Sequence, residues 1–566
     1  MNTPTPAIVT QRDVQRLPRL ALILFCAAYL LPGLFGRDPW KNADIAAFGH
    51  MLGVARGWSD WFTPSVGGIP ATGGGLFPYW LGAAFIKLLP WLDPAFAARI
   101  PFTLMLGSVL LFTWYSAYHL ARSDAAQPLP LAFGGEAQPG DYARAIADGA
   151  LLALIATIGL LQLGHETTPE LVQLAGFSAY LYALSAAAMK TRFARAAVLV
   201  ALPLMAGSGS PSIALLAGAA GIALCYVATD SDTQAFAPWV IASAVLATVT
   251  AWATSTWAWR LSAPPSPFEL VKTLSWFTWP AWPMAGWTAW QWRHHVRYRH
   301  IAIPLALGGV GVVACIAVGG SDRALLLSLP ASAVLASFAL PTLKRSVSSA
   351  IDWFSVFFFT AIGLAIWFIF SAMYTGVPAK TAANVFKLAA PGFKPALSWL
   401  GICFAAAGTV AWLALVRWRT SRHQHALWKS LVLPACGVTM CWLLLMTLWL
   451  PLLDHARSYR NLVERVVRRL PTNASVAAPG ANVSLLTALE YFGHLQVDGQ
   501  TPANQSSRRY LIISLPARSA APTIDGWQQV ARERQRTINT ESIVIYRRIA
   551  KSDSGASGSE QVSENP

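Results

Sequence analysis

Long runs of apolar residues, separated by short polar segments, follow one another along most of this chain. An α-helix of about 20 apolar residues is long enough to cross the hydrocarbon core of a bilayer. The runs lie at residues 20–35, 96–121, 146–164, 171–189, 195–207, 212–229, 236–258, 275–292, 301–318, 325–341, 351–373, 396–416 and 428–450. They predict an all-α polytopic membrane domain of about 13 transmembrane helices over residues 1–453.

The basic residues between these runs predict the orientation of the chain. Arg12, Arg16 and Arg19 precede the first run, and arginines and histidines cluster in residues 293–300. Because Lys and Arg collect in cytoplasmic loops, we expect the N-terminus in the cytoplasm. An odd number of crossings then places the C-terminal part outside. The first run lacks a small-residue cleavage site, so we expect an uncleaved anchor and not a signal peptide.

The composition excludes several classes of protein. Hydrophobic residues make up 55% of the chain and charged residues 12%, a balance that excludes a soluble enzyme and a large disordered protein. The net charge of +16 is spread over short clusters and not gathered in one patch, so it indicates topology and predicts no nucleic-acid partner. All six cysteines lie in apolar stretches without paired metal-site spacing, so we expect neither disulfides nor a structural zinc.

The composition becomes that of a soluble protein after the last apolar run. Short alternating segments at residues 510–515 and 542–546 predict β-strands. We therefore expect a small external α/β domain over residues 454–549. The remaining residues, 550–566, are rich in Ser, Gly and acidic residues and predict a disordered tail.

The first external loop, residues 37–93, carries ionisable residues close to a membrane exit. Asp38, Lys41 and Asp44 follow shortly after the first run, where charged groups are costly unless they are solvated or used. After Asp44, apolar residues recur at helical spacing and predict an amphipathic helix on the outer membrane surface. Its apolar positions are Ile45, Phe48, Leu52 and Ala55. Asp44 is then either a cap of this helix, where Asp is favoured, or a catalytic carboxylate.

An ordered set of motifs resembles those of a known enzyme family. The set comprises Arg37-Asp-Pro-Trp-Lys-x-x-Asp44, Pro78-Tyr-Trp-Leu81, Arg99-Ile-Pro101, His165-Glu-x-x-Pro-Glu170, Trp276-Phe-Thr-Trp-Pro-Ala-Trp-Pro283 and Arg323-Ala-Leu-Leu-Leu-Ser-Leu-Pro330. It extends over most of the membrane part and is similar to the GT-C glycosyltransferases related to lipid A aminoarabinose transferase and protein O-mannosyltransferases. The odd number of helices and the external C-terminal domain also fit that family.

The resemblance implies a glycosyltransferase of the bacterial inner membrane that uses a polyprenyl (undecaprenyl) phosphate sugar donor. Its acceptor would be lipid A, another envelope glycan or a protein on the periplasmic side. Asp44 matches the family's first-loop acid and is the expected catalytic base, and cations would stabilise the leaving phosphate. The substrate-binding residues that we expect are Asp38, Lys41, Glu166, Lys272 and Arg323. Basic side chains near helix ends also extend to lipid headgroups, and this alternative applies to each of the three cations.

A long lipid donor also predicts a groove between helices that opens to the bilayer. The helix after Asp44 and the loop over residues 375–395 would form its roof. Lys380, Lys387 and Lys394 in this loop would attract anionic substrates or headgroups, so membrane lipids are further expected partners.

The chain departs from the family pattern in two places. Gly73, Gly74 and Gly75 stand where the family commonly has an acid, a Lys and a Pro, and Thr168 stands in place of an Asp. The missing acid would bear on metal or phosphate binding, so the sequence assigns no definite cofactor and leaves a divalent metal as an alternative. A divergent donor and an inactive relative are further alternatives. Glu166 is a candidate to replace the missing Asp, although it also fits an exposed acid at a helix start.

A non-enzymatic membrane protein, either a flippase for lipid-linked sugars or a transporter, is the alternative function. It explains the number of helices and the external basic residues equally well. A transporter carries its ionisable residues near the bilayer midplane, whereas a GT-C enzyme is expected to gather them at one end. The positions of Asp44, Glu166, Lys272 and Arg323, all expected near the outer face, distinguish the two.

Overall fold

Helices overlap every apolar run that the sequence predicts. The computed structural model describes residues 7–71, 73, 75–130, 135–228, 230–257, 261–389, 393, 397–420, 426–471, 474–516, 518–534 and 541–549. The helices over the runs are α1 (Arg19–Leu30), α4 (Pro94–Ala121), α5 (Pro139–Ala156), α6 (Ile158–Leu163), α7 (Pro169–Ala186), α8 (Thr191–Gly207), α9 (Pro211–Val227), α11 (Ala237–Ala253), α13 (Ala281–Gln291), α14 (Arg299–Ala317), α16 (Ser328–Ser337), α17 (Arg345–Thr375), α19 (Trp399–Thr420) and α20 (Lys429–Leu448). Six helical segments of the described chain are long and apolar enough to cross a membrane, and shorter helices cover the other runs. The chain is a multi-pass helical membrane protein, as predicted.

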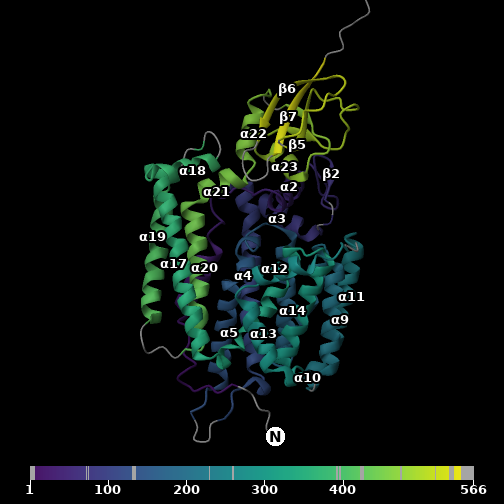
Figure 1. Ribbon diagram of the computed structural model, residues 1–566. Helices are drawn as coiled ribbons and strands as arrows, with labels where there is room; N and C mark the ends of the chain where they lie inside the picture. The colour runs from purple at the N-terminus through teal and green to yellow at the C-terminus, as the bar shows by residue number, and fades with distance from the viewer. Residues whose placement is uncertain are drawn as a thin grey trace, which may run out of the picture.

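Shorter elements lie around this bundle. They are α2 (Ala43–Ala55), α3 (Leu76–Leu88), α10 (Ser231–Gln234), α12 (Pro267–Phe277), α15 (Asp322–Leu325), α18 (Ala379–Ala389), α21 (Leu450–Arg457), the 3-10 helices η1 (Asp124–Ala126), η2 (Arg293–His295) and η3 (Leu340–Thr342), and the strands β1 (Ser65–Val66) and β2 (Ile69–Pro70). Figure 1 shows α2, α18 and α21 at one end of the bundle and α10 at the other. We call the first of these the outer end.

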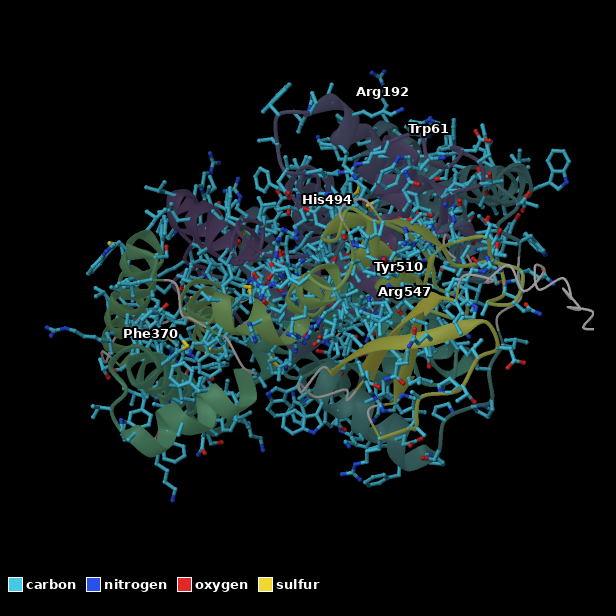
Figure 2. The ribbon with its side chains drawn as sticks, turned by 90° about the horizontal axis from the view of Figure 1, so that it is seen from above. Trp61, Arg192, Phe370, His494, Tyr510 and Arg547 are labelled. Atoms are coloured by element: carbon cyan, nitrogen blue, oxygen red, sulfur yellow. The ribbon has the colours of Figure 1, made fainter. Side chains whose placement is uncertain are left out.

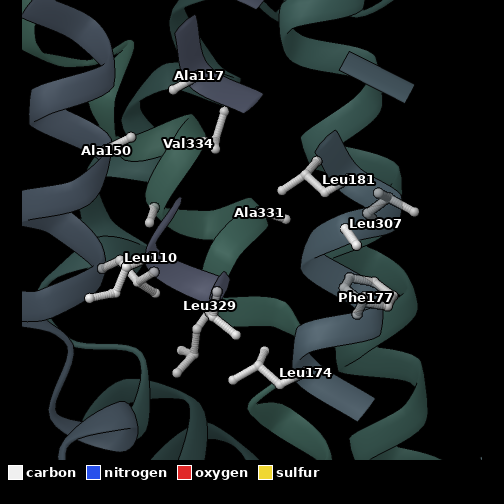
Figure 3. Packing of buried hydrophobic residues seen from close by; sticks show 14 of the residues in the cluster. Leu110, Ala117, Ala150, Leu174, Phe177, Leu181, Leu307, Leu329, Ala331 and Val334 are labelled. Atoms are coloured by element: carbon white, nitrogen blue, oxygen red, sulfur yellow. The ribbon is translucent and has the colours of Figure 1, made fainter. Parts of the chain in front are cut away.

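Helices α4, α5, α7, α14 and α16 all contribute to the buried core shown in Figure 3. Leu110, Phe177, Leu181, Leu307 and Val334 lie there and are almost completely buried. Alanines on the same helices allow close approach of the backbones, which suits helices that associate within lipid through dispersion forces.

The C-terminal part forms a small α/β unit above the outer end (Figure 1). Its elements are α22 (Arg460–Val467), α23 (Val483–Tyr491), β3 (Ser475–Ala477), β4 (Gln496–Asp498), β5 (Tyr510–Pro516), β6 (Trp527–Arg534) and β7 (Glu541–Arg548). The strand order is β4-β3-β5-β7-β6, with β3 parallel to β4 and β5 and the other pairs antiparallel. The two predicted strands are β5 and β7, which pair through Tyr510 and Arg547, seen close together in Figure 2. The predicted tail, residues 550–566, lies outside the described residues.

The helix predicted after Asp44 forms as α2, but it is not a surface helix. Most of its side chains are buried, because α3 covers it on one side and α23 of the C-terminal unit contacts it on the other. At Gly49 the approach is so close that a Cβ atom would lie 1.9 Å from the hydroxyl oxygen of Thr487. The prediction of an amphipathic helix on the outer membrane surface was therefore wrong, because the helix pattern gives no sign that a distant segment packs on it.

Candidate functional site

Asp44 lies in the first turn of α2, where two separate segments donate hydrogen bonds to its carboxylate. Its Oδ1 accepts from the backbone N–H and the hydroxyl of Thr167, at 2.8 and 2.7 Å. Its Oδ2 accepts from the backbone N–H of Trp40 at 3.0 Å and from Nη2 of Arg37 at 3.3 Å. Asp44 is 1% exposed, so it ties the loop before α2 to the corner before α7 without competition from solvent.

Arg37 is the charge partner of Asp44. Its side chain is fully buried, and Nη2 also donates to the backbone carbonyl of His165 at 2.9 Å. Burial alone would raise the pKa of Asp44, but the charges of Arg37 and Arg99 and the hydrogen bonds from Thr167 outweigh burial and lower the pKa. A carboxylate held in its ionised form is a strong anchor for donors but a weak proton acceptor.

The corner between α6 and α7 carries Glu166 and faces α15. Oε2 of Glu166 lies 2.6 Å from Nη2 of Arg323, and Oε1 accepts from Nε2 of Gln162 at 3.0 Å. Burial raises the pKa of Glu166, and the charge of Arg323 partly offsets this effect. Because the neighbouring Thr167 bonds to Asp44, the predicted residues Asp44, Glu166 and Arg323 belong to one connected group. We call this group, with Arg37 and Thr167, the outer-end cluster.

The corner owes its shape to the start of α7. Pro169 is the first residue of that helix, and Thr168 before it is extended, which leaves the preceding residues free to face α2 and α15. Thr168, which replaces the family's Asp, is buried and brings no charge. Glu166 is also buried and pairs with Arg323, so the alternative of an exposed loop acid does not describe it.

Asp38 and Lys41 contact the C-terminal part of the chain instead of the outer-end cluster. Asp38 forms an ion pair with Arg460, with a shortest distance of 2.6 Å. Nζ of Lys41 donates to the carbonyl of Ala456 at 3.4 Å and lies 5.2 Å from the ring centroid of Tyr459. Their assignment to substrate binding stays a prediction.

Trp40 joins these two groups of residues through Asp454, a carboxylate that sequence analysis missed. Oδ1 of Asp454 accepts from Nε1 of Trp40 at 2.8 Å and from the backbone N–H of Asp38 at 3.3 Å. The guanidinium groups of Arg37 and Arg457 both lie over the Trp40 ring, at 4.7 and 5.0 Å from its centroid. Burial raises the pKa of Asp454 to about 7, although the bond from Trp40 opposes the rise. In the sequence, only the position of Asp454 at the expected start of the external domain could have indicated it.

A cavity of about 680 Å³ lies beside the outer-end cluster. Gln162 of α6, Thr273 and Trp276 of α12, and Asp322 of α15 line it together with glycines 319 and 320. Gln162 bonds to Glu166, and Asp322 precedes Arg323, so the cavity adjoins the ion pair. Lys272 is exposed on α12 next to this lining and has no ion-pair partner within the described part of the chain.

Buried guanidinium atoms at this site lack hydrogen-bond partners. Among the described residues these atoms are Nε and Nη1 of Arg37, Nη2 of Arg99 and Nη1 of Arg323. Arg99 lies in a motif noted in the sequence but was given no role there. Unpaired buried donors are costly, so they favour an anionic ligand at this place. No group of three or more His, Cys, Asp or Glu side chains in the described ranges is placed to hold a metal ion.

Gly75, one of the three glycines that depart from the expected motif, has a packing role. A Cβ atom at Gly75 would lie 2.0 Å from the carbonyl oxygen of Gly207 and 2.3 Å from the backbone nitrogen of Gly209. Backbone atoms cannot move aside as a flexible side chain does, so only glycine fits where α3 begins against the end of α8. Gly73 has a φ of +82°, and Gly74 lies outside the described residues.

Two solved structures are similar to this chain over almost its whole length, whereas no protein-family model and no curated protein sequence matches it. The crystal structure of ArnT from Cupriavidus metallidurans bound to undecaprenyl phosphate has a TM-score of 0.62 and 14% sequence identity, and the match covers 94% of this chain and 99% of that chain. The apo structure of the same protein has a TM-score of 0.61 and 14% identity, with 93% and 98% covered. The resemblance seen in the motifs is therefore confirmed at the level of structure: the chain has the GT-C-like membrane fold of ArnT.

Proposed function

We propose that this chain is a glycosyltransferase that takes its sugar from a polyprenyl phosphate, such as undecaprenyl phosphate, and reacts at the outer end of the bundle. The outer-end cluster is the observation that carries the proposal. It gathers carboxylates and guanidinium groups at one end of the molecule, beside a cavity that adjoins Arg323. The shared fold with ArnT, which was crystallised with undecaprenyl phosphate, supports a donor of the same class.

The proposed reaction needs positive charge near the leaving group. An acceptor oxygen attacks the anomeric carbon, the bond from that carbon to the phosphate oxygen breaks, and the polyprenyl phosphate leaves with the electron pair. Donors placed where this charge develops lower the barrier. Arg323 fits this role, because its side chain is 24% exposed and its Nη1 has no hydrogen-bond partner among the described residues.

Glu166 and Glu170 set the position of Arg323. The ion pair with Glu166 at 2.6 Å fixes one side of the guanidinium, and Glu170 lies 3.9 Å from Nη1. A phosphate that bound against Arg323, beside the cavity, would meet a cation already oriented by these carboxylates. Lys272, exposed on the neighbouring helix, would supply a second charge to the same phosphate.

Asp44 acts in this proposal mainly as an orienting carboxylate. Four donors occupy its two oxygens, and its pKa is lowered, so it must release a donor before it can accept the proton of an acceptor hydroxyl. Its role as general base stays a prediction that the variants described in the Discussion distinguish from orientation.

The location and the acceptor belong to the same proposal. We place the chain in a bacterial inner membrane, with the N-terminus in the cytoplasm and the C-terminal unit in the periplasm. The acceptor is a hydroxyl or phosphate group of lipid A, another envelope glycan or a protein. Gathering of Asp44, Glu166 and Arg323 in one connected group favours this function over the transporter alternative, which needs charges near the midplane.

Mass spectrometry of the envelope tests the proposal. Cells that lack the protein are expected to accumulate a polyprenyl-phosphate sugar and to lose one modified envelope component. Cells with Arg323→Ala are expected to behave the same way at equal protein levels, whereas Arg293→Ala, at the opposite end, serves as the matched control. An unchanged lipid-linked sugar pool in the deletion strain would contradict the proposal. Movement of the intact lipid-linked sugar across vesicles, without its consumption, would establish the flippase.

A further inference from the structure

A second cavity, of about 440 Å³, lies far from the outer-end cluster. It is formed between α9 and α14, with Leu184 of α7 and Thr233 of α10 at its edge. Figure 1 places α10 at the end of the bundle opposite to the C-terminal unit. The cavity therefore faces the leaflet opposite to the proposed reaction site.

The walls of this cavity are apolar and built from small residues. Ala220 and Ala223 line it from α9, and Ala302 and Ala306 line it from α14, so the two helices leave a hollow between them. Leu305 is partly exposed at the same place, which indicates that the hollow opens toward the lipid phase. A hydrocarbon chain is the ligand that suits such walls.

The rim of the cavity is cationic. Arg297 and Arg299 line it, and they belong to the basic segment over residues 293–300. Nη2 of Arg299 donates to the carbonyl of Leu184 at 3.2 Å, and Nη1 lies 3.7 Å from Asp230. Nε of Arg299 is buried without a hydrogen-bond partner in the described part of the chain.

Among the described residues, the neighbouring carboxylates of Asp230 and Asp232 offset the charge of Arg299 but form no ion pair with Arg297. Asp230 already accepts from the backbone and hydroxyl of Thr233, and it contacts only Arg299 of the two rim arginines. Arg297 is exposed and has no ion-pair partner within the described ranges. By contrast, Arg293 in the same segment lies over Trp290, 4.7 Å from its ring centroid. The exposed charge of Arg297, next to the partly offset charge of Arg299, lies above an apolar hollow and complements a lipid with an anionic headgroup and a hydrocarbon tail.

We propose that this cavity binds one anionic phospholipid of the leaflet opposite to the C-terminal unit. An acyl chain lies between α9 and α14, and the headgroup phosphate contacts Arg297 and Arg299. The site differs from the proposed donor site in its place, in its lining and in the leaflet that it faces. It is independent of the proposed catalytic function, because neither cavity wall carries a residue of the outer-end cluster.

Native mass spectrometry of the purified full-length protein in detergent, with added phosphatidylglycerol or phosphatidylcholine, tests the site. The wild type is expected to retain phosphatidylglycerol in preference to phosphatidylcholine. Arg297→Ala removes one headgroup contact and is expected to weaken phosphatidylglycerol binding about fivefold. Arg293→Ala removes an equal charge from the same segment but not from the rim, and it is expected to bind as the wild type does.

Filling the hollow provides the second arm of the test. Ala306→Phe places a ring between the walls and is expected to abolish preferential retention, while Ala223→Phe fills the same space from the other helix if the first variant does not fold. Inorganic phosphate alone is expected to leave phosphatidylglycerol retention unchanged, because the tail contributes to binding. Equal retention of both lipids, full retention in a filled variant, or equal losses for Arg293→Ala and Arg297→Ala would overturn the proposal.

Discussion

Replacement of Asp44 by Asn separates an orienting carboxylate from a simple proton acceptor. The carboxylate accepts four hydrogen bonds and faces the fully buried side chain of Arg37. Asn has nearly the same shape but no charge, and its amide places one NH₂ group where an oxygen accepted. That group would meet either the N–H of Thr167 or the N–H of Trp40, so donors would face each other.

The structure gives the size of the expected effect. Removal of one partner from a buried ion pair costs about 3–5 kcal/mol, because the remaining charge is left without compensation. We therefore expect Asp44→Asn to lower the free energy of unfolding by about that amount. An exposed general base would behave differently, since surface substitutions usually change stability by no more than about 0.5 kcal/mol.

Thermal unfolding in detergent, measured beside sugar transfer, is the assay. Asp454→Asn is the matched control, because burial raises the pKa of Asp454 to about 7 and the neutral amide resembles its protonated form. The double variant Arg37→Met with Asp44→Asn removes both charges and is expected to recover part of the lost stability. If Asp44→Asn unfolds like the wild type and yet loses transfer, the argument from burial is wrong and Asp44 acts directly on the substrate.

Three further predictions follow from the geometry. Gly49→Ala is expected to lower the free energy of unfolding by about 1–3 kcal/mol, because its Cβ would overlap the side chain of Thr487. Adding Thr487→Ala should restore part of this stability, because the Thr487 hydroxyl makes no hydrogen bond to the described residues. Equal protease sensitivity of the C-terminal unit in all variants would contradict this prediction. Burial raises the pKa values of Asp454 and Glu490 to about 7 in the folded protein, so the free energy of unfolding is expected to fall as the pH rises from about 4 to 7. The unfolding midpoints of Asp454→Asn and Glu490→Gln should decline less over this range. Identical pH profiles for the wild type and both variants would refute the raised pKa values. Arg323→Ala should reduce the rate of transfer from a polyprenyl-phosphate sugar by about tenfold or more, whereas Arg323→Lys should retain part of that rate. A wild-type rate for Arg323→Ala in a vesicle assay would exclude contact between Arg323 and the donor phosphate.

The C-terminal unit explains why the loop of Asp44 has a defined conformation. Backbone and side-chain bonds join that loop to the unit at several points, including Arg460 to Asp38 and the hydroxyl of Ser484 to the carbonyl of Asn42. Tyr491 of α23 reaches Asp93, just before α4, at 2.8 Å. These contacts join the unit to both ends of the external loop, near its start at Asp38 and at its end at Asp93, so the unit restrains the loop.

Local patterns were sufficient to predict the membrane helices. The length of an apolar run and the position of basic residues are properties of consecutive residues, so each predicted run appears as a helix. Strands β5 and β7 were predicted for the same reason, because alternation along a strand is local. The alternating topology also placed Asp44, Glu166 and Arg323 near one end of the bundle.

Local sequence patterns could not predict which residues the charged side chains contact. Asp44 meets Thr167, 123 residues away along the chain, and Trp40 meets Asp454, 414 residues away. The sequence by itself determined that Asp44 follows a membrane exit and begins a helix. Only the tertiary structure decided that α23 covers this helix, that Arg37 neutralises the buried carboxylate, and that Glu166 pairs with Arg323 while Asp38 turns to Arg460. The physical reason is that apolar length and helical periodicity act between neighbours in sequence, whereas burial and ion pairing depend on which distant segments pack together.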